Sequence, residues 1–170
     1  MAAGNTYVAL ASNTLTTTAA SVTFSAISGS YTDLILAINT TVSSGTPNIT
    51  LQFNGDTGSN YSCTTLSGNG GGGGGESNRL STQTYIRTSF NGNPSTGTAY
   101  QNSLIHINNY ISSTAHKSVL IRNNNAYTAG VDLIVGAWRD NTTISSLVIA
   151  TTSSTFASGS TFTLYRIAAA

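Results

Sequence analysis

Residues 49–58 read Ile-Thr-Leu-Gln-Phe-Asn-Gly-Asp-Thr-Gly, and this stretch predicts the class of fold. Ile49, Leu51 and Phe53 alternate with polar residues, which is the period of a β-strand that turns one face toward a core. Asn54-Gly55 follows at once and favours a tight turn, because both residue types tolerate a positive φ. A short, half-buried strand that ends in a tight turn is typical of an all-β protein.

The same alternation recurs along the chain in short apolar segments separated by turn residues. Two further segments, 34–38 and 131–137, are apolar on both faces, so we expect them to be central strands covered on both sides. Gly136 inside the second segment predicts a bulge or a close backbone approach. The alternating segments centre on Val22 and Phe24, Ile105 and Ile107, Val119 and Ile121, and Phe162 and Leu164.

About ten short strands without a sustained helical period predict an all-β antiparallel sandwich of the jelly-roll type, with little or no helix. We expect residues 1–6 to form an N-terminal arm and residues 7–170 to form one sandwich domain. Six consecutive glycines, Gly70 to Gly75, predict a flexible loop over residues 68–76, because ordering glycine costs the most backbone entropy.

The composition excludes several classes of partner. Only 6% of the residues are charged and the net charge is +1, whereas about 25% of an average domain is charged. The six basic residues are scattered, so no stripe for nucleic acid is expected. No apolar run approaches the roughly 20 residues that span a bilayer, so no membrane partner is expected. A surface this poor in charge favours association, and we expect a homo-oligomer, a trimer.

The residues that carry chemistry are few and dispersed. The two histidines, His106 and His116, do not fall in a dense cluster with the five carboxylates, whereas a metal site needs three or four converging ligands. The glycine run lacks the helix and Lys-Ser/Thr of a phosphate loop, and no nucleophile-elbow motif is present. Cys63 is expected to be a small apolar filler. We therefore expect no catalytic residue, no metal, no cofactor and no enzymatic activity.

Two groups of residues are candidates for special roles. Trp138 with its neighbour Arg139 is expected to be a core or interface anchor, with a sugar-stacking platform as the alternative. The candidate interface comprises Met1, Ala2, Ala3, Trp138 and Arg139. The candidate fold-defining turn comprises Asn54, Gly55, Asp56, Gly58 and Tyr61, with side-chain to backbone bonds expected from Asn54 and Asp56.

Motifs spread over most of the chain carry a family resemblance. The most specific is Phe53–Ser62; the others are Leu10–Ser12, Thr14–Thr16, Ala20–Phe24, Tyr31–Leu34, Asn109–Tyr110, Ser112–Thr114, Lys117–Val119, Gly136–Trp138 and Phe162–Tyr165. In these motifs the chain resembles jelly-roll virion structural proteins of tailed bacteriophages, which are common in phages of cyanobacteria. The glycine run is not part of the resemblance, so it leaves Gly68–Glu76 without a counterpart.

The resemblance implies a structural protein of the virion: a capsid decoration (cement) protein, a head fibre or a part of a tail fibre. From it we expect a trimer that is made in the host cytoplasm, lies on the capsid exterior, and bridges major capsid proteins through its loops and N-terminal arm. The alternative is a receptor-binding fibre module whose partner is a host-surface glycan. That alternative needs exposed aromatic residues grouped at one end of the sandwich: Tyr85, Tyr100, Tyr110, Tyr127 and Trp138.

Overall fold

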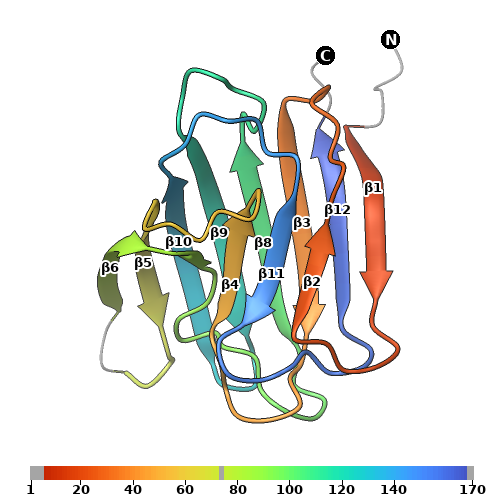
Figure 1. Ribbon diagram of the computed structural model, residues 1–170. Coiled ribbons are helices and arrows are strands. Elements are labelled where there is room, and N and C mark those ends of the chain that lie inside the picture. The colour runs from red at the N-terminus through yellow and green to blue at the C-terminus, as the bar shows by residue number, and fades with distance from the viewer. Residues whose placement is uncertain (1–5, 73–74, 168–170) are drawn as a thin grey trace.

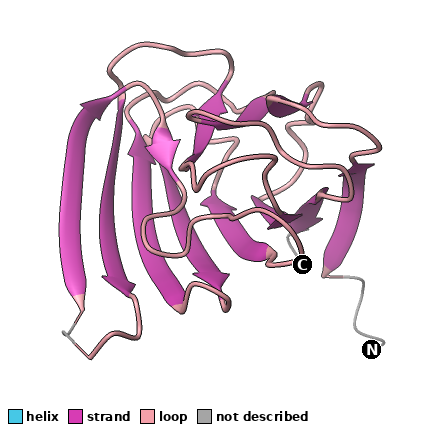
Figure 2. Cartoon of the chain, turned by 90° about the horizontal axis from the view of Figure 1, so that it is seen from below, coloured by secondary structure: helices cyan, strands magenta, loops and turns pink. Residues whose placement is uncertain are grey.

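The computed structural model describes residues 6–72 and 75–167, and within these residues it contains twelve strands and no helix (Figures 1 and 2). The strands are β1 (Tyr7–Thr14), β2 (Ser21–Phe24), β3 (Asp33–Thr40), β4 (Ile49–Phe53), β5 (Tyr61–Gly68), β6 (Glu76–Gln83), β7 (Ile86–Arg87), β8 (Gln101–Asn108), β9 (Lys117–Asn125), β10 (Gly130–Trp138), β11 (Leu147–Thr151) and β12 (Thr161–Ile167). The predicted all-β class is confirmed.

The strands form two antiparallel sheets that pack face to face (Figure 1). The large sheet has the order β1-β12-β3-β8-β9-β10-β5-β6, and the small sheet has the order β2-β11-β4-β7. Without β5, β6, β9 and β10, the two orders are β1-β12-β3-β8 and β2-β11-β4-β7. Successive strands of this eight-stranded core are distributed over two facing four-stranded sheets in the jelly-roll order. The pairs β5–β6 and β9–β10 extend the large sheet beyond β8.

The core lies between the two sheets and is built by the alternation that the sequence predicts. In β9 and β10 the buried residues occur at every second position, as in the series Val119, Ile121 and Asn123. Phe156 and Phe162 pack edge to face at 4.9 Å between ring centroids. The small sheet contributes Val22, Phe24, Leu51 and Phe53, which are all buried. Burial of these side chains is the main source of stability.

A buried carboxylate fixes the loop after β7 to the β9–β10 hairpin. Asp132 is 2% exposed and accepts hydrogen bonds from the backbone N–H groups of Phe90, Asn91 and Gly92 at 2.8–3.0 Å. The side-chain amide of Asn123 donates to the same carboxylate at 2.7 Å. Four donors compensate the burial of this charge, so Asp132 serves the fold.

The two segments that are apolar on both faces differ in their surroundings. In β3 the outward-facing Ile35 is only 5% exposed, but Ala37 is half-buried and Asn39 is exposed on the same face, so the predicted covering of both faces holds only at Ile35. In β10 the outward-facing Val131, Leu133 and Val135 are 56%, 44% and 54% exposed. The expectation of two covered faces is therefore wrong for β10, because the small sheet lies on the inner face alone.

The structure decides between a bulge and a close backbone approach at Gly136 of β10. The register of β10 with β5 and β9 runs without a shift at this position, so there is no bulge. A Cβ atom at Gly136 would lie 2.7 Å from Cγ2 of both Ile86 and Val119. Glycine is required here because the side chains of the opposite sheet and the neighbouring strand approach the backbone closely.

Candidate functional site

The outer face of the large sheet is the candidate functional site. Three hollows of about 590, 390 and 280 Å³ lie on this face, and Arg122 of β9 lines all three. The face is wide because β9, β10 and β5 prolong the sheet beyond the jelly-roll core. Side chains reach it from every second residue of each strand.

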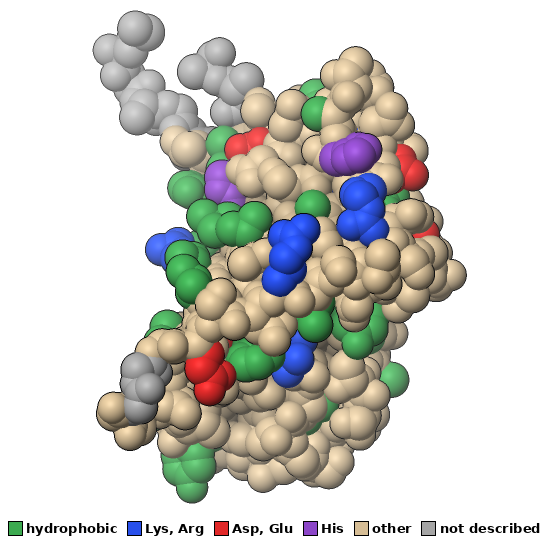
Figure 3. Space-filling model, turned by 90° about the vertical axis from the view of Figure 1, so that its left-hand side faces the viewer, with side chains coloured by type: hydrophobic (Ala, Val, Ile, Leu, Met, Phe, Trp, Pro, Cys, Tyr) green, Lys and Arg blue, Asp and Glu red, His purple; other side chains and the backbone are tan. Residues whose placement is uncertain are grey.

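Exposed apolar side chains form one side of this face, which we call the outer strip. Val135 is the cross-strand neighbour of Leu120, and Leu133 is the neighbour of Leu66. Their exposed fractions, with that of Val131, lie between 41% and 57%. In Figure 3 several hydrophobic side chains gather along the left-hand border of the molecule. The outer strip consists of Leu66, Leu120, Val131, Leu133 and Val135.

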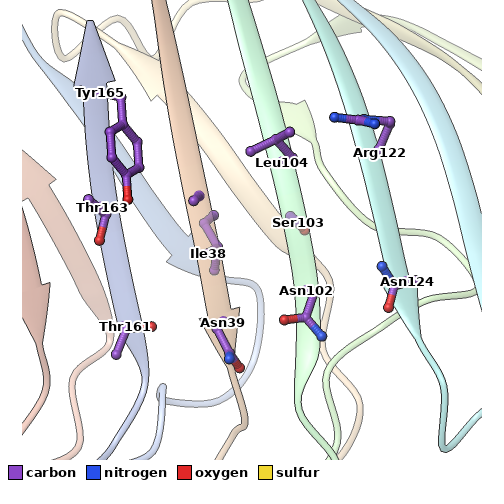
Figure 4. Close-up of a pocket in the computed structure, with 11 residues that line it drawn as sticks. Ile38, Asn39, Asn102, Ser103, Leu104, Arg122, Asn124, Thr161, Thr163 and Tyr165 are labelled. Carbon is purple, nitrogen blue, oxygen red and sulfur yellow. The ribbon is translucent and has the colours of Figure 1, made fainter. Parts of the chain in front are cut away.

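Polar side chains form the other side of the face, which we call the polar groove. Thr161, Asn39, Asn102 and Asn124 are successive cross-strand neighbours on β12, β3, β8 and β9. They line a hollow of about 590 Å³, shown in Figure 4. Within the described residues, none of the three amides makes a hydrogen bond through its side chain. The groove therefore presents donors and acceptors that the fold does not use.

Arg122 lies where the outer strip and the polar groove meet. Its cross-strand neighbours are Leu104 on β8 and Leu133 on β10, and Figure 4 shows its side chain directed toward Leu104. In the part of the chain that the structure describes, the guanidinium makes no hydrogen bond and no salt bridge. An exposed guanidinium without a partner in the described residues can pair with an anionic group.

A polar pair borders the third hollow. His106 Nε2 lies 2.8 Å from Asp33 Oδ2, and the other carboxylate oxygen of Asp33 accepts the backbone N–H of Asn109 at 2.7 Å. His106 is therefore tied to the end of β3 and lines the hollow beside Tyr7 and Leu120. Within the described residues, Asp33 makes no salt bridge with Arg122.

The predicted turn motif folds as a compact hydrogen-bonded unit. Asn54 and Gly55 have φ values of +53° and +70°, and the N–H of Asp56 donates to the carbonyl of Phe53 at 2.9 Å. Asp56 Oδ1 accepts the N–H of Gly58 at 2.7 Å, and Asn54 Oδ1 accepts the N–H of Ser145 at 2.9 Å. The turn predicted from Asn-Gly is present, and it leads the chain from the small sheet into the large one.

The same unit holds Tyr61 and Trp138 in the core. Trp138 Nε1 donates to Asp56 Oδ2 at 2.6 Å, and the Tyr61 hydroxyl accepts the N–H of Phe53 at 3.1 Å. The Tyr61 and Trp138 rings stack at 6.2 Å between centroids. Burial acts to raise the pKa of Asp56, but hydrogen bonds from Trp138, Asn60 and Gly58 outweigh it, so the pKa is lowered. Burial raises the pKa of Tyr61 to about 12.

The candidate interface residues do not come together at one described surface. Trp138 is 1% exposed, so it anchors the core, and its assignment to an interface is corrected. Its indole faces Phe53 and Tyr61 and leaves no surface for sugar stacking. Arg139 is exposed and donates to the carbonyl of Ser59 at 2.6 Å. Met1, Ala2 and Ala3 lie outside the described residues.

The aromatic residues that the receptor-binding alternative requires are also dispersed. Tyr110 is fully buried and donates to the carbonyl of Ser28. Tyr127 is 81% exposed in the loop between β9 and β10, and Tyr85 is half-buried before β7. Tyr100 is 36% exposed and directly precedes β8, whose start pairs with the end of β9, so Tyr100 and Tyr127 lie at the same end of the sheet. Within the described residues the five aromatic residues do not form one exposed group, because Tyr110 is buried and Tyr85 is half-buried. The polar groove could not be predicted from the sequence, because its asparagines are separated by up to 85 positions along the chain and meet only through strand order.

Titratable groups elsewhere are tied to the fold. Cys63 is buried, and burial raises the pKa of its thiol. Lys117 is 1% exposed and donates to the carbonyls of Ser112 and Ala115, while burial lowers its pKa. Within residues 6–72 and 75–167, no three His, Cys, Asp or Glu side chains converge as metal ligands. No helix in the described residues is long and apolar enough to cross a membrane.

Comparisons with known proteins bear on the fold alone. No family model matches the chain, and no curated protein matches it. A solved structure that is similar to the chain is the exo-inulinase of Aspergillus awamori, with a TM-score of 0.52 and 12% sequence identity. The similarity covers 95% of this chain and 29% of the exo-inulinase chain, so this chain spans less than a third of that protein.

Proposed function

We propose that the protein is a non-enzymatic structural protein of a bacteriophage virion, a capsid decoration protein that binds the assembled head through the outer strip. One observation carries the proposal. Leu66, Leu133 and Val135 are each about half exposed to solvent on the outer face of the large sheet. Exposed apolar patches of this kind mark surfaces that another protein covers. The resemblance of the sequence to virion proteins of tailed bacteriophages is the reason why we expect the partner to be a capsid protein.

The low charge of the chain supports the same proposal. A neutral surface with exposed leucines and valines promotes association in a free monomer. On a particle, the outer strip is removed from water by the major capsid protein, and each buried apolar Å² contributes roughly 25 cal/mol before the costs of association. A homotrimer over a junction between capsid proteins adds the same contacts three times, which raises the avidity.

A second candidate function is a receptor-binding module on a fibre, with a host-surface glycan as partner. The polar groove favours it, because three uncommitted amides stand side by side on neighbouring strands. The dispersed aromatic residues do not contribute to this candidate. We rank it second because the outer strip needs a protein partner whether or not the groove is occupied.

A charge placed in the outer strip tests the proposed function. The variant Leu133→Glu puts a carboxylate at the centre of the strip, and we expect it to lose binding to particles that lack the protein, by about tenfold or more, because a buried unpaired charge is costly. Co-sedimentation with purified particles measures the binding. The matched control is Thr23→Glu, an equal change of charge at an exposed position of β2 in the small sheet.

The two variants separate the possible outcomes. Circular dichroism and the midpoint of thermal unfolding establish that both variants are folded. Retained binding by Thr23→Glu with loss in Leu133→Glu supports the proposal. Undiminished binding by Leu133→Glu contradicts it, as does an absence of the wild-type protein from particles. A wild-type protein that is a monomer in solution and is also bound as a monomer on the particle contradicts the trimer.

A further inference from the structure

We propose that the polar groove binds an acidic oligosaccharide, with Arg122 pairing a sugar carboxylate and the amide row binding hydroxyl groups. This inference rests on the second candidate function and names its ligand and its residues. The groove adjoins the outer strip, and the two surfaces meet at Arg122.

The first step of the inference is the geometry of the amide row. Asn39, Asn102 and Asn124 are direct cross-strand neighbours, and Thr161 continues the row on β12. Four strands at about 4.8 Å spacing give a row about 14 Å long. Figure 4 shows these side chains side by side on the same face. The row has the length of a short chain of linked sugars.

The second step is the chemistry of the row. A side-chain amide both donates and accepts hydrogen bonds, and so does a sugar hydroxyl. Within the described residues, the side chains of Asn102, Asn124 and Thr161 are not engaged in hydrogen bonds with the rest of the chain. Their bonding capacity is therefore available to a ligand without breaking a bond of the fold. A row of carboxylates or lysines would select by charge, whereas this row selects by hydroxyl geometry.

The third step is the charge at the end of the groove. Arg122 adjoins Asn124 two residues along β9 and lines the same hollow. Its position on β9 lies between Leu104 and Leu133, and its exposed side chain is directed toward Leu104 (Figure 4). The planar fork of arginine matches a carboxylate in a bidentate pair, and such charge-assisted bonds are about twice as strong as neutral ones. A sugar acid thus fits the groove better than a neutral sugar.

The apolar residues of the groove complete the fit. Leu104 is half-buried at the groove floor, and Tyr165 lies along β12 at its border (Figure 4). Tyrosine offers an apolar ring and a polar hydroxyl, which suits a sugar with one apolar face and several hydroxyls.

Calorimetric titration with a galacturonate trimer and with the galactose trimer of the same linkage tests the inference. We expect the acid to bind roughly tenfold or more tightly than the neutral trimer, since hydrogen bonds to a charged group are the stronger ones. The variant Arg122→Gln is expected to lose this preference. Asn102→Ala combined with Asn124→Ala is expected to weaken binding of both trimers. Circular dichroism verifies that each variant is folded.

The variant Arg79→Gln is the matched control, because Arg79 is exposed on β6 of the same sheet and its loss changes the net charge equally. Unchanged affinity in Arg79→Gln with loss in Arg122→Gln supports a defined site. Equal losses in both variants overturn the inference, because they indicate unspecific attraction. Equal binding of both trimers, or no binding of either at millimolar concentration, also overturns it. None of these outcomes alters the particle-binding test, which uses Leu133→Glu.

Discussion

At the scale of single residues, Gly136 is a position where the packed core leaves no room for a side chain. Its missing side chain lets Ile86 of the small sheet pack against β10, and both Ile86 and Val119 are within 1% of full burial. Adding a Cβ forces these side chains apart in a packed core. We expect Gly136→Ala to lower the free energy of unfolding by about 1–3 kcal/mol, the usual cost of overpacking. Urea denaturation measures the change.

Gly68 provides the control for this prediction. A Cβ atom at Gly68 would meet only Cγ1 of Val131, at an ordinary contact distance of 3.6 Å. We expect Gly68→Ala to change the free energy of unfolding by less than about 0.5 kcal/mol. Comparable losses in the two variants would show that glycine at position 136 does not serve close packing.

At the scale of elements, β10 has one buried and one exposed apolar face. Ile134 points into the core and is fully buried, whereas Leu133 points outward and is 44% exposed. We expect Ile134→Thr to lower the free energy of unfolding by about 2–4 kcal/mol, because it removes buried carbon and buries a hydroxyl group. We expect Leu133→Thr to change it by less than about 0.5 kcal/mol.

Chemical denaturation measures the free energy of unfolding of both variants, at a protein concentration low enough to prevent association. The comparison is matched because both variants receive threonine. A large loss in Leu133→Thr would mean that the outer face of β10 packs against the chain itself. In that case the outer strip would not be a surface for a partner.

Elements also show how far prediction from the sequence extends. The alternating segments around Phe24, Phe53 and Ile121 specify one buried face, and the structure confirms each as a strand. The strands β1, β5, β6, β7 and β11 are missing from the predicted segments. For β1 and β6 the reason is that most of their residues are exposed, so no clear alternation marks them. Residues 131–137 are apolar on both faces of β10, although only one face is buried. Composition alone does not separate an exposed apolar face from a buried one.

Less of the candidate site than of the fold could be predicted from the sequence. Asn54, Gly55 and Asp56 signal their turn locally, because the dipeptide itself prefers positive φ. The partners of Asp56 are not local, since Trp138 reaches it only through the pairing of β10 with β5. The polar groove depends in the same way on the order of β12, β3, β8 and β9. Side chains brought together by strand order leave no periodic signal in the chain.

At the scale of the whole molecule, the two faces of the large sheet have different roles. The inner face closes the core against the small sheet, and the outer face carries the outer strip, Arg122 and the polar groove. The added β9–β10 and β5–β6 pairs give the large sheet eight strands, whereas the small sheet has four. These added strands carry the outer strip. The extension of a jelly-roll core thus supplies the surface to which we assign function.

Hydroxyl-radical footprinting of the protein on purified particles, compared with the isolated protein, tests the central claim most directly. The proposal predicts that Leu66, Leu120 and Leu133 are oxidised much less on the particle, while Val148 on the outer face of the small sheet reacts equally in both states. Unchanged oxidation of the three leucines, or protection of the small sheet in their place, would contradict the assignment of function to the outer face of the large sheet.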